Sequence, residues 1–191
     1  MEFKFFTDLI DALGKVADGF KAITNLTKAE RDKYRETLKE TFLLIDTTLN
    51  MVIIRLNDVL HQSTDVDFMR EATTFDYIPS WLNAEREFRL CHSLRVALRE
   101  TQTISGKLTG FISTNDWDIL LKQMQDILST ENAVADFITQ KFQALAHGGR
   151  AAGANPQTIT ILREQIEAFL QQVNEERRKL MKQEIGLYEV V

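Results

Sequence analysis

The most constraining feature of this sequence is the spacing of its apolar residues, which recur every three or four positions over long stretches. This spacing places them on one side of an α-helix. Only two prolines and eight glycines occur in 191 residues, and most of them fall between the periodic stretches. Long helices need this distribution, whereas a β protein with many turns has more of both residues. The sequence therefore predicts an all-α fold.

The first predicted helix covers residues 3–24, and its apolar side includes Phe3, Phe6, Ile10, Leu13 and Phe20. Gly14 and Gly19 each weaken it by up to about 1 kcal/mol relative to alanine. A helix of this length with two glycines is marginal in isolation, so its stability must come from the surface on which its apolar side docks.

Two helix starts carry the clearest local signals. Residues 27–30 form a capping box, in which the Thr27 hydroxyl and the Glu30 carboxylate satisfy backbone N–H groups. The helix that begins there is predicted to run to about His61. Its contiguous apolar face contains Phe42, Ile45, Leu49, Val52, Ile53, Leu56, Val59 and Leu60. Asn155 before Pro156 predicts the start of the last helix, which should end at Gly186. The stripe of that helix contains Ile159, Leu162, Ile166, Phe169, Leu170, Val173, Leu180 and Ile185.

The middle of the chain is predicted to hold two further long helices. One follows Pro79 and ends at Gly110, and the other starts at a cap over residues 113–116 and ends at Gly148 and Gly149. Periodicity fails in the connection between residues 62 and 79, where we expect no more than one or two helical turns.

The four helices after residue 27 each span roughly 30 residues, or about 45 Å. Matched lengths and short connections favour an up-down antiparallel four-helix bundle over residues 27–186. The helix within residues 1–24 would lie against it, and residues 187–191 would form a tail. We expect one domain over residues 1–191, since a chain of this length buries a sizeable core without disulfides.

Composition sets the expected environment. The formal net charge of −5 argues against nucleic-acid binding. Cys91 is the only cysteine, which excludes an internal disulfide and fits a reducing cytoplasm. The N-terminal residues carry acids and lack a signal peptide's apolar core, and the densest apolar stretch, 42–60, is broken by polar residues. We expect no transmembrane segment.

A search for site chemistry yields no catalytic, cofactor or metal residues. A di-iron bundle needs Glu-x-x-His pairs, which are absent, and His61, His92 and His147 lack partner histidines at metal-ligand spacing. The glycine patterns that expose a serine nucleophile or hold phosphate are absent too. We therefore predict neither a cofactor nor an enzymatic activity.

An arginine followed by a histidine six residues later occurs twice, as Arg55 with His61 and Arg86 with His92. This spacing resembles the motif of the helical HEPN ribonucleases, and the resemblance implies cleavage of an RNA backbone. Residues six apart project about 120° from each other on a regular helix, so catalysis would need a distorted helix end or a dimer interface.

We expect structural roles for charged residues on two of the predicted helices. Asp46 lies at the edge of an apolar face, where partial exposure and a structural role are expected. The cations near the end of the last helix, within residues 175–182, are interpreted as groups that suit the dipole at a helix C-terminus, so no partner is needed to explain them.

Residues 1–24 are the predicted interaction helix, with Phe3, Phe6, Ile10, Leu13 and Phe20 as its contact residues. An amphipathic helix before a four-helix bundle resembles HeLo-type and other cell-death bundles in outline, which implies contact with a membrane surface. Its polar side mixes both charges, however, which favours packing within the chain. The leading hypothesis is a non-enzymatic interaction or regulatory module with a protein partner or self-association. The alternatives are a membrane-active or cell-death effector and a HEPN-like ribonuclease.

Overall fold

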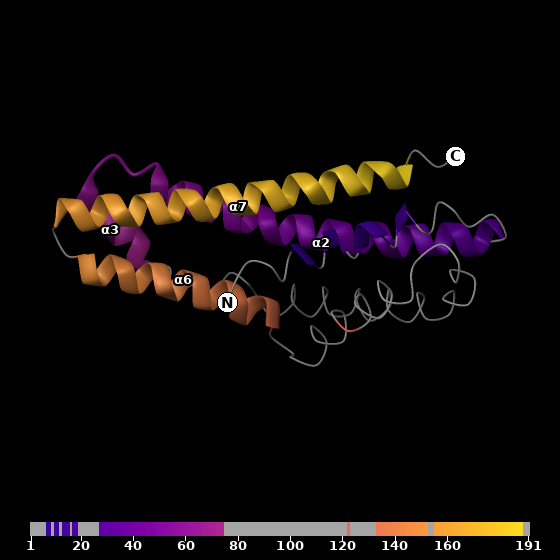
Figure 1. The fold of residues 1–191 in the computed structure, drawn as a ribbon, viewed down its shortest axis with the longest axis horizontal. Helices are drawn as coiled ribbons and strands as arrows, with labels where there is room; N and C mark the ends of the chain where they lie inside the picture. The colour runs from indigo at the N-terminus through magenta and orange to yellow at the C-terminus, as the bar shows by residue number, and fades with distance from the viewer. Residues whose placement is uncertain are drawn as a thin grey trace. The chain divides into compact units, whose positions relative to one another are not determined.

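The structure, a computed structural model, describes most positions between 7 and 18, residues 27–74, Lys122, and residues 133–152 and 155–188. Within these ranges the chain is helical and contains no strand, which confirms the all-α prediction for this part (Figure 1). The helices are α2 (Lys28–Leu60), α3 (Asp65–Thr73), α6 (Ala133–Ala152) and α7 (Pro156–Tyr188). The helix predicted over 80–110 lies outside the described residues.

Helix α2 begins at the predicted capping box. The Glu30 backbone N–H donates to Thr27 Oγ1 at 3.3 Å, and the Thr27 N–H donates to Glu30 Oε2 at 2.9 Å. These reciprocal bonds satisfy N–H groups that have no partner within the helix. The predicted apolar face is buried along its length from Phe42 to Val59, and Leu60 is half-buried. Both the start and the face of this helix are confirmed.

Helix α7 begins where Asn155 and Pro156 predicted it. The Gln157 N–H donates to Asn155 Oδ1 at 3.0 Å, which caps the first turn. The predicted end at Gly186 is wrong, because the helix continues through that glycine to Tyr188. One glycine costs a helix only about 1 kcal/mol, which the packing of the preceding turns can offset.

Helix α3 is longer than the one or two turns expected in the connection after α2. It has nine residues and begins at Thr64, whose Oγ1 accepts from the Asp67 N–H at 3.1 Å and donates to Asp67 Oδ2 at 2.7 Å. Phe68 and Ala72 are its buried residues. The local signal that the sequence analysis missed is the Thr64-x-x-Asp67 cap.

The prediction that the helix before residue 150 stops at Gly148 and Gly149 is wrong, since α6 runs through both glycines to Ala152. Gly149 is buried, and a Cβ atom placed on it would lie 3.6 Å from both Ala72 Cβ and Leu162 Cδ2. The two glycines therefore mark the place where α6 lies close to α3 and α7.

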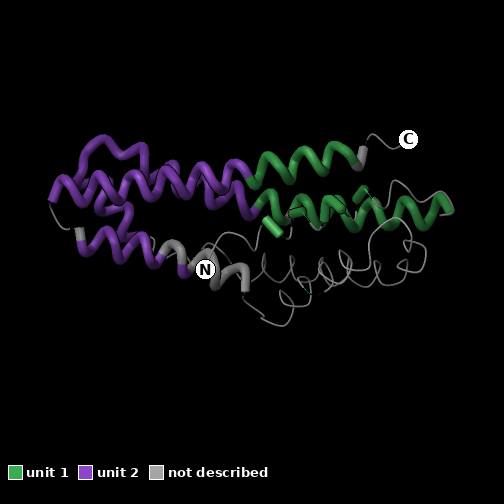
Figure 2. The backbone as a smooth tube through the Cα atoms, viewed as in Figure 1, with its two compact units in different colours: residues 1–47, 88–131, 176–191 green, residues 48–87, 132–175 purple. Residues whose placement is uncertain are grey.

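The chain divides into two compact units, which Figure 2 colours separately. Unit 1 contains the N-terminal segment, here defined as the described positions between 7 and 18, together with α2 up to Thr47, Lys122 and α7 from Glu176. Among the described residues of unit 1, the buried apolar ones are Ile10, Leu13, Ala17, Tyr34, Leu38, Phe42, Ile45 and Leu180.

Unit 2 contains α2 from Thr48, α3, the described α6 and α7 up to Glu175. Helix α3 packs against α6. Among the described residues of unit 2, the buried apolar ones are Leu49, Val52, Ile53, Leu56, Val59, Phe68, Ala72, Ala146, Ile159, Leu162, Ile166, Phe169 and Val173. The expectation of a single domain and of an up-down bundle stays a prediction.

We predict that Gly149→Ala raises the free energy of unfolding by up to about 1 kcal/mol, because alanine favours the helix and its methyl group would make ordinary contacts. Gly148→Ala is the matched control. Its Cβ would lie 3.3 Å from Leu162 Cδ1, so part of the gain is lost as that side chain shifts. Urea denaturation of the three proteins measures both changes as midpoint shifts at constant m-value. A destabilised Gly149→Ala would contradict the observed packing.

Candidate functional surface

A two-bond ion pair connects α2 and α7 in unit 1. Arg177 Nε donates to Asp46 Oδ1 at 2.6 Å, and Arg177 Nη2 donates to Asp46 Oδ2 at 3.2 Å (the two side chains are half-buried). Fork-shaped pairing of this kind is stronger and more directional than a single contact. The partial exposure expected for Asp46 is confirmed, whereas the helix-dipole interpretation of the cations in residues 175–182 did not anticipate that Arg177 pairs with this carboxylate.

The same pair sets the charge state of the arginine. Its hydrogen bond to Asp46 raises the pKa of the Arg177 guanidinium, the Coulomb attraction to that carboxylate raises it further, and burial opposes both. A raised folded-state pKa contributes stability that is present at neutral pH, far below the ordinary arginine value, and that is lost as the pH rises through the raised value. The pair therefore holds α2 to α7 throughout the neutral range.

Three large apolar side chains near this ion pair are exposed. Leu43 precedes Asp46 by three residues, Met181 follows Arg177 by four, and Ile185 follows after another four. Residues three or four apart share a side of a helix, so all three lie on the side of the α2·α7 pair that carries the ion pair. Leu43 is 61% exposed, Met181 46% and Ile185 56%. The sequence analysis had placed Ile185 in the buried stripe.

An open groove of about 570 Å³ adjoins Leu43. The residues that line it are Lys33, Glu36, Thr37, Lys39, Glu40, Leu43 and Glu184. Three carboxylates face two ammonium groups there, and Lys39 Nζ lies 2.9 Å from Glu36 Oε1. The groove is therefore weakly acidic. We call this groove together with Leu43, Met181 and Ile185 the exposed face of unit 1.

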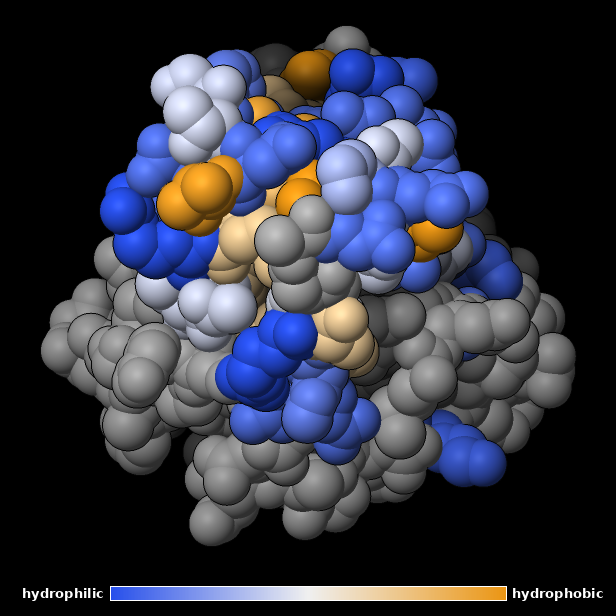
Figure 3. Space-filling view, turned by 90° about the vertical axis from the view of Figure 1, so that its left-hand side faces the viewer, coloured by the Kyte–Doolittle hydropathy of each residue, from blue (hydrophilic) through white to orange (hydrophobic). Residues whose placement is uncertain are grey.

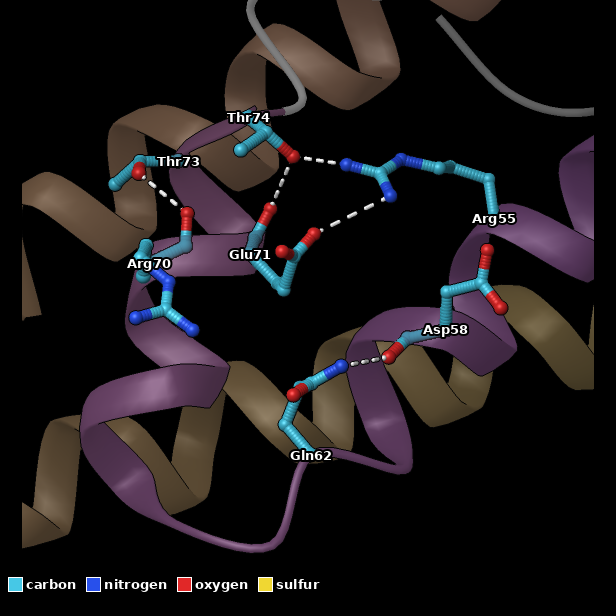
Figure 4. Close-up of polar contacts among 7 residues, drawn as sticks. All are labelled: Arg55, Asp58, Gln62, Arg70, Glu71, Thr73 and Thr74. Carbon is cyan, nitrogen blue, oxygen red and sulfur yellow. Dashed lines mark hydrogen bonds and ion pairs between the residues drawn. The ribbon is translucent and has the colours of Figure 1, made fainter.

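A polar cluster in unit 2 joins α2 to the end of α3 (Figure 4). Arg55 Nη1 donates to Glu71 Oε2 at 3.3 Å, and Arg55 Nη2 donates to Thr74 Oγ1. Thr74 Oγ1 in turn donates to the Glu71 carbonyl oxygen at 2.7 Å, at the C-terminal cap of α3. These bonds give Arg55 a structural role as the link between two helices.

His61, the partner of Arg55 in the first Arg/His spacing, lies just after α2. Its ring is exposed, and its Nδ1 lies 2.8 Å from the Asn57 carbonyl oxygen. A carbonyl oxygen only accepts, so Nδ1 carries the proton in this contact. The contact is local to the helix end. Arg86 and His92, the second spacing, lie outside the described residues.

Arg163 performs a similar linking role where α7 begins. Its guanidinium lies 3.9 Å from the centroid of the Phe68 ring, Nη2 donates to Asp65 Oδ1 at 3.3 Å, and Nη1 donates to the Leu60 carbonyl oxygen at 3.4 Å. One side chain thus stabilises the end of α2 and the start of α3. Figure 3 shows this end of the structure, where the described surface is mostly hydrophilic and its apolar residues are scattered.

The structure describes two of the five residues predicted to form the interaction helix. Ile10 and Leu13 are buried in unit 1, whereas Phe3, Phe6 and Phe20 lie outside the described residues. The sequence analysis did not single out Leu43 or Met181. Helical spacing alone does not separate an exposed leucine or methionine from a core residue, so it contained no signal for them.

No protein-family model, curated protein or solved structure matches the chain. Among the described residues, no group of three or more His, Cys, Asp or Glu side chains is arranged to hold a metal ion. None of the helices in the described ranges combines the length and hydropathy that crossing a membrane requires. The ion pair, the groove and the exposed apolar side chains are thus the features available for a functional assignment.

We predict a coupling free energy of about 1 kcal/mol or more between Asp46 and Arg177, because two charge-assisted bonds in a half-buried site resist solvent screening. The measurement is a double-mutant cycle of Asp46→Ala and Arg177→Ala by urea denaturation at neutral pH. The matched cycle replaces Arg177→Ala with Arg178→Ala, at the exposed neighbouring position, and should show additive effects. Additivity in the first cycle would mean that the ion pair contributes nothing to stability.

Proposed function

We propose that this chain is a non-enzymatic protein-interaction module that binds a partner protein on the exposed face of unit 1. The observation that carries this proposal is the exposure of Leu43, Met181 and Ile185 beside an open groove. Apolar side chains grouped on one side of a protein are typical of interaction sites, whereas single ones are ordinary. Because Arg177 and Asp46 connect the two helices, the face is preorganised, which lowers the entropy cost of binding.

The chemistry of the groove specifies the partner. Leu43 lines the groove, and Met181 and Ile185 are exposed on the neighbouring helix α7. Exposed apolar side chains on two neighbouring helices suit an amphipathic helix that contributes its own apolar residues. Glu36, Glu40 and Glu184 line the groove and outnumber its two lysines. The matching ligand is therefore a helix whose apolar residues are flanked by lysine or arginine, since complementary charge accelerates association and fixes orientation.

This proposal includes the fold and setting expected from the sequence, a four-helix up-down bundle over residues 27–186 that works in the cytoplasm. Two observations support the bundle. Helices α2 and α7 have 33 residues each, a length suited to side-by-side packing. In unit 1 the two helices run antiparallel. Arg177 of α7 pairs with Asp46 of α2, and Glu184, which follows Arg177 in α7, lines a groove with residues 33–43, which precede Asp46 in α2.

Site-specific photo-crosslinking in the native host tests the interaction. A photoreactive phenylalanine analogue replaces Leu43 in one protein and Gln172, an exposed polar residue of α7 in unit 2, in the control. We expect a discrete adduct from position 43 and none from position 172. The further change Ile185→Glu should abolish the adduct, since a buried carboxylate would face the partner's apolar residues. That position is exposed, so the fold, monitored by circular dichroism, should be unchanged.

Two results would overturn the proposal. One is the absence of any adduct that depends on Ile185. The other is a concentration-dependent dimer, measured by light scattering on the purified protein, that Ile185→Glu dissociates, since the occupant of the face would then be a second copy of the chain.

A further inference from the structure

The N-terminal segment docks its apolar side into unit 1. Ile10, Leu13 and Ala17 are at most 1% exposed, whereas Asp11 and Lys15 are exposed. Spacings of three and four residues put the three buried side chains on one side of a helix, and Gly14 shares that side. The segment is therefore a docked amphipathic helix whose buried side contains a glycine.

Gly14 lies against Gln183 of α7. A Cβ atom placed on Gly14 would lie 2.4 Å from Gln183 Nε2 and 2.6 Å from Gln183 Cδ, distances at which one of the groups must move. Any larger residue at position 14 would require the Gln183 side-chain amide to move. The N-terminal segment consequently covers α7 at Gln183.

The side chain of Gln183 has a polar atom that lacks a hydrogen-bond partner. Gln183 Oε1 is buried and has no hydrogen-bond partner. A buried acceptor of this kind destabilises the covered state, because the same oxygen would bond to water if the cover were absent. Glu176, two turns earlier on α7 and 7% exposed, has one carboxylate oxygen in the same condition. This end of unit 1 therefore buries polar atoms that solvent would satisfy.

The segment has little stability of its own to offset this penalty. A short isolated helix is marginal in water, and the glycine at position 14 lowers its helix propensity further. Its apolar contacts hold it in place, while the contact at Gln183 favours release. An apolar residue at position 183 would remove the unpaired acceptor, but the sequence has a glutamine there.

We propose that the N-terminal segment is a releasable cover, a contact that opens at Gln183 while α2 and α7 stay folded. Opening hydrates Gln183 Oε1 and exposes the apolar side chains of Ile10, Leu13 and Ala17. In the open state the amphipathic N-terminal segment is therefore detached from the rest of unit 1. This inference does not rest on the proposed partner of the exposed face.

Hydrogen exchange measured by mass spectrometry on the full chain tests this proposal. In the wild type, amides of residues 7–18 should exchange faster than those of the cores of α2 and α7, as expected for local opening. Gln183→Leu replaces the amide with an apolar group of similar size. Because it removes the unpaired acceptor, exchange in residues 7–18 should slow by at least about fivefold, and exchange in α2 should not change.

A second pair of variants probes the close contact itself. Gly14→Ala should accelerate exchange of residues 7–18, because the added methyl group meets Gln183, although alanine by itself favours the helix. Adding Gln183→Ala makes room for that methyl group and should restore slow exchange. Asp11→Ala, at an exposed position one turn earlier, is the control and should leave exchange close to that of the wild type.

The proposal is overturned if residues 7–18 exchange only together with α2 and α7, since the segment would then be an integral part of the core. It is also overturned if Gln183→Leu leaves exchange unchanged or accelerates it. Slower exchange in Gly14→Ala would have the same consequence, because it would show that helix propensity and not the contact at Gln183 controls opening.

Discussion

Burial of one continuous face of α2 is the constraint on which the described structure depends. This helix has 33 residues and supplies core residues to both compact units, including Phe42 in unit 1 and Leu56 in unit 2. Fully burying a side chain of this size contributes about 1.5–3 kcal/mol, so the face supplies a large share of the favourable free energy. Helix α7 has the same length and also contributes to both units, and the other described helices each pack within one.

Arginine side chains supply the directional contacts between these helices. Arg177 pairs with Asp46 in unit 1, and in unit 2 Arg55 and Arg163 connect α2, α7 and the short helix α3. Half-buried ion pairs add modest net stability, because desolvation cancels much of the attraction, but they select one arrangement of the helices. Large apolar residues are exposed in both units, but only Leu43, Met181 and Ile185 among the described ones belong to unit 1, where they accompany the open groove.

Gly149 and Gly14 both lie in close contacts between helices, but the two contacts differ in the space available for a side chain. At Gly149 there is room for a methyl group, so the close approach of α6 to its neighbours would survive alanine. At Gly14 a methyl group would require the Gln183 side-chain amide to move, and that side chain carries a buried oxygen without a partner. The first contact is compatible with a permanent core. The second combines close approach with a buried, unpaired acceptor, and the proposed opening rests on that acceptor.

The sequence by itself determined the helical class, the caps at Thr27 and Asn155 and the buried face of α2, because each depends on residues within a few turns of one another. Tertiary structure decided the rest. Helix α6 passes through its glycines because packing outweighs their low propensity, and Arg177 is fixed by a carboxylate far away in the chain. Whether an apolar residue such as Ile185 is core or surface depends on which helix lies beside it. Helical periodicity identifies a face, but the identity of its neighbour is a property of the folded chain.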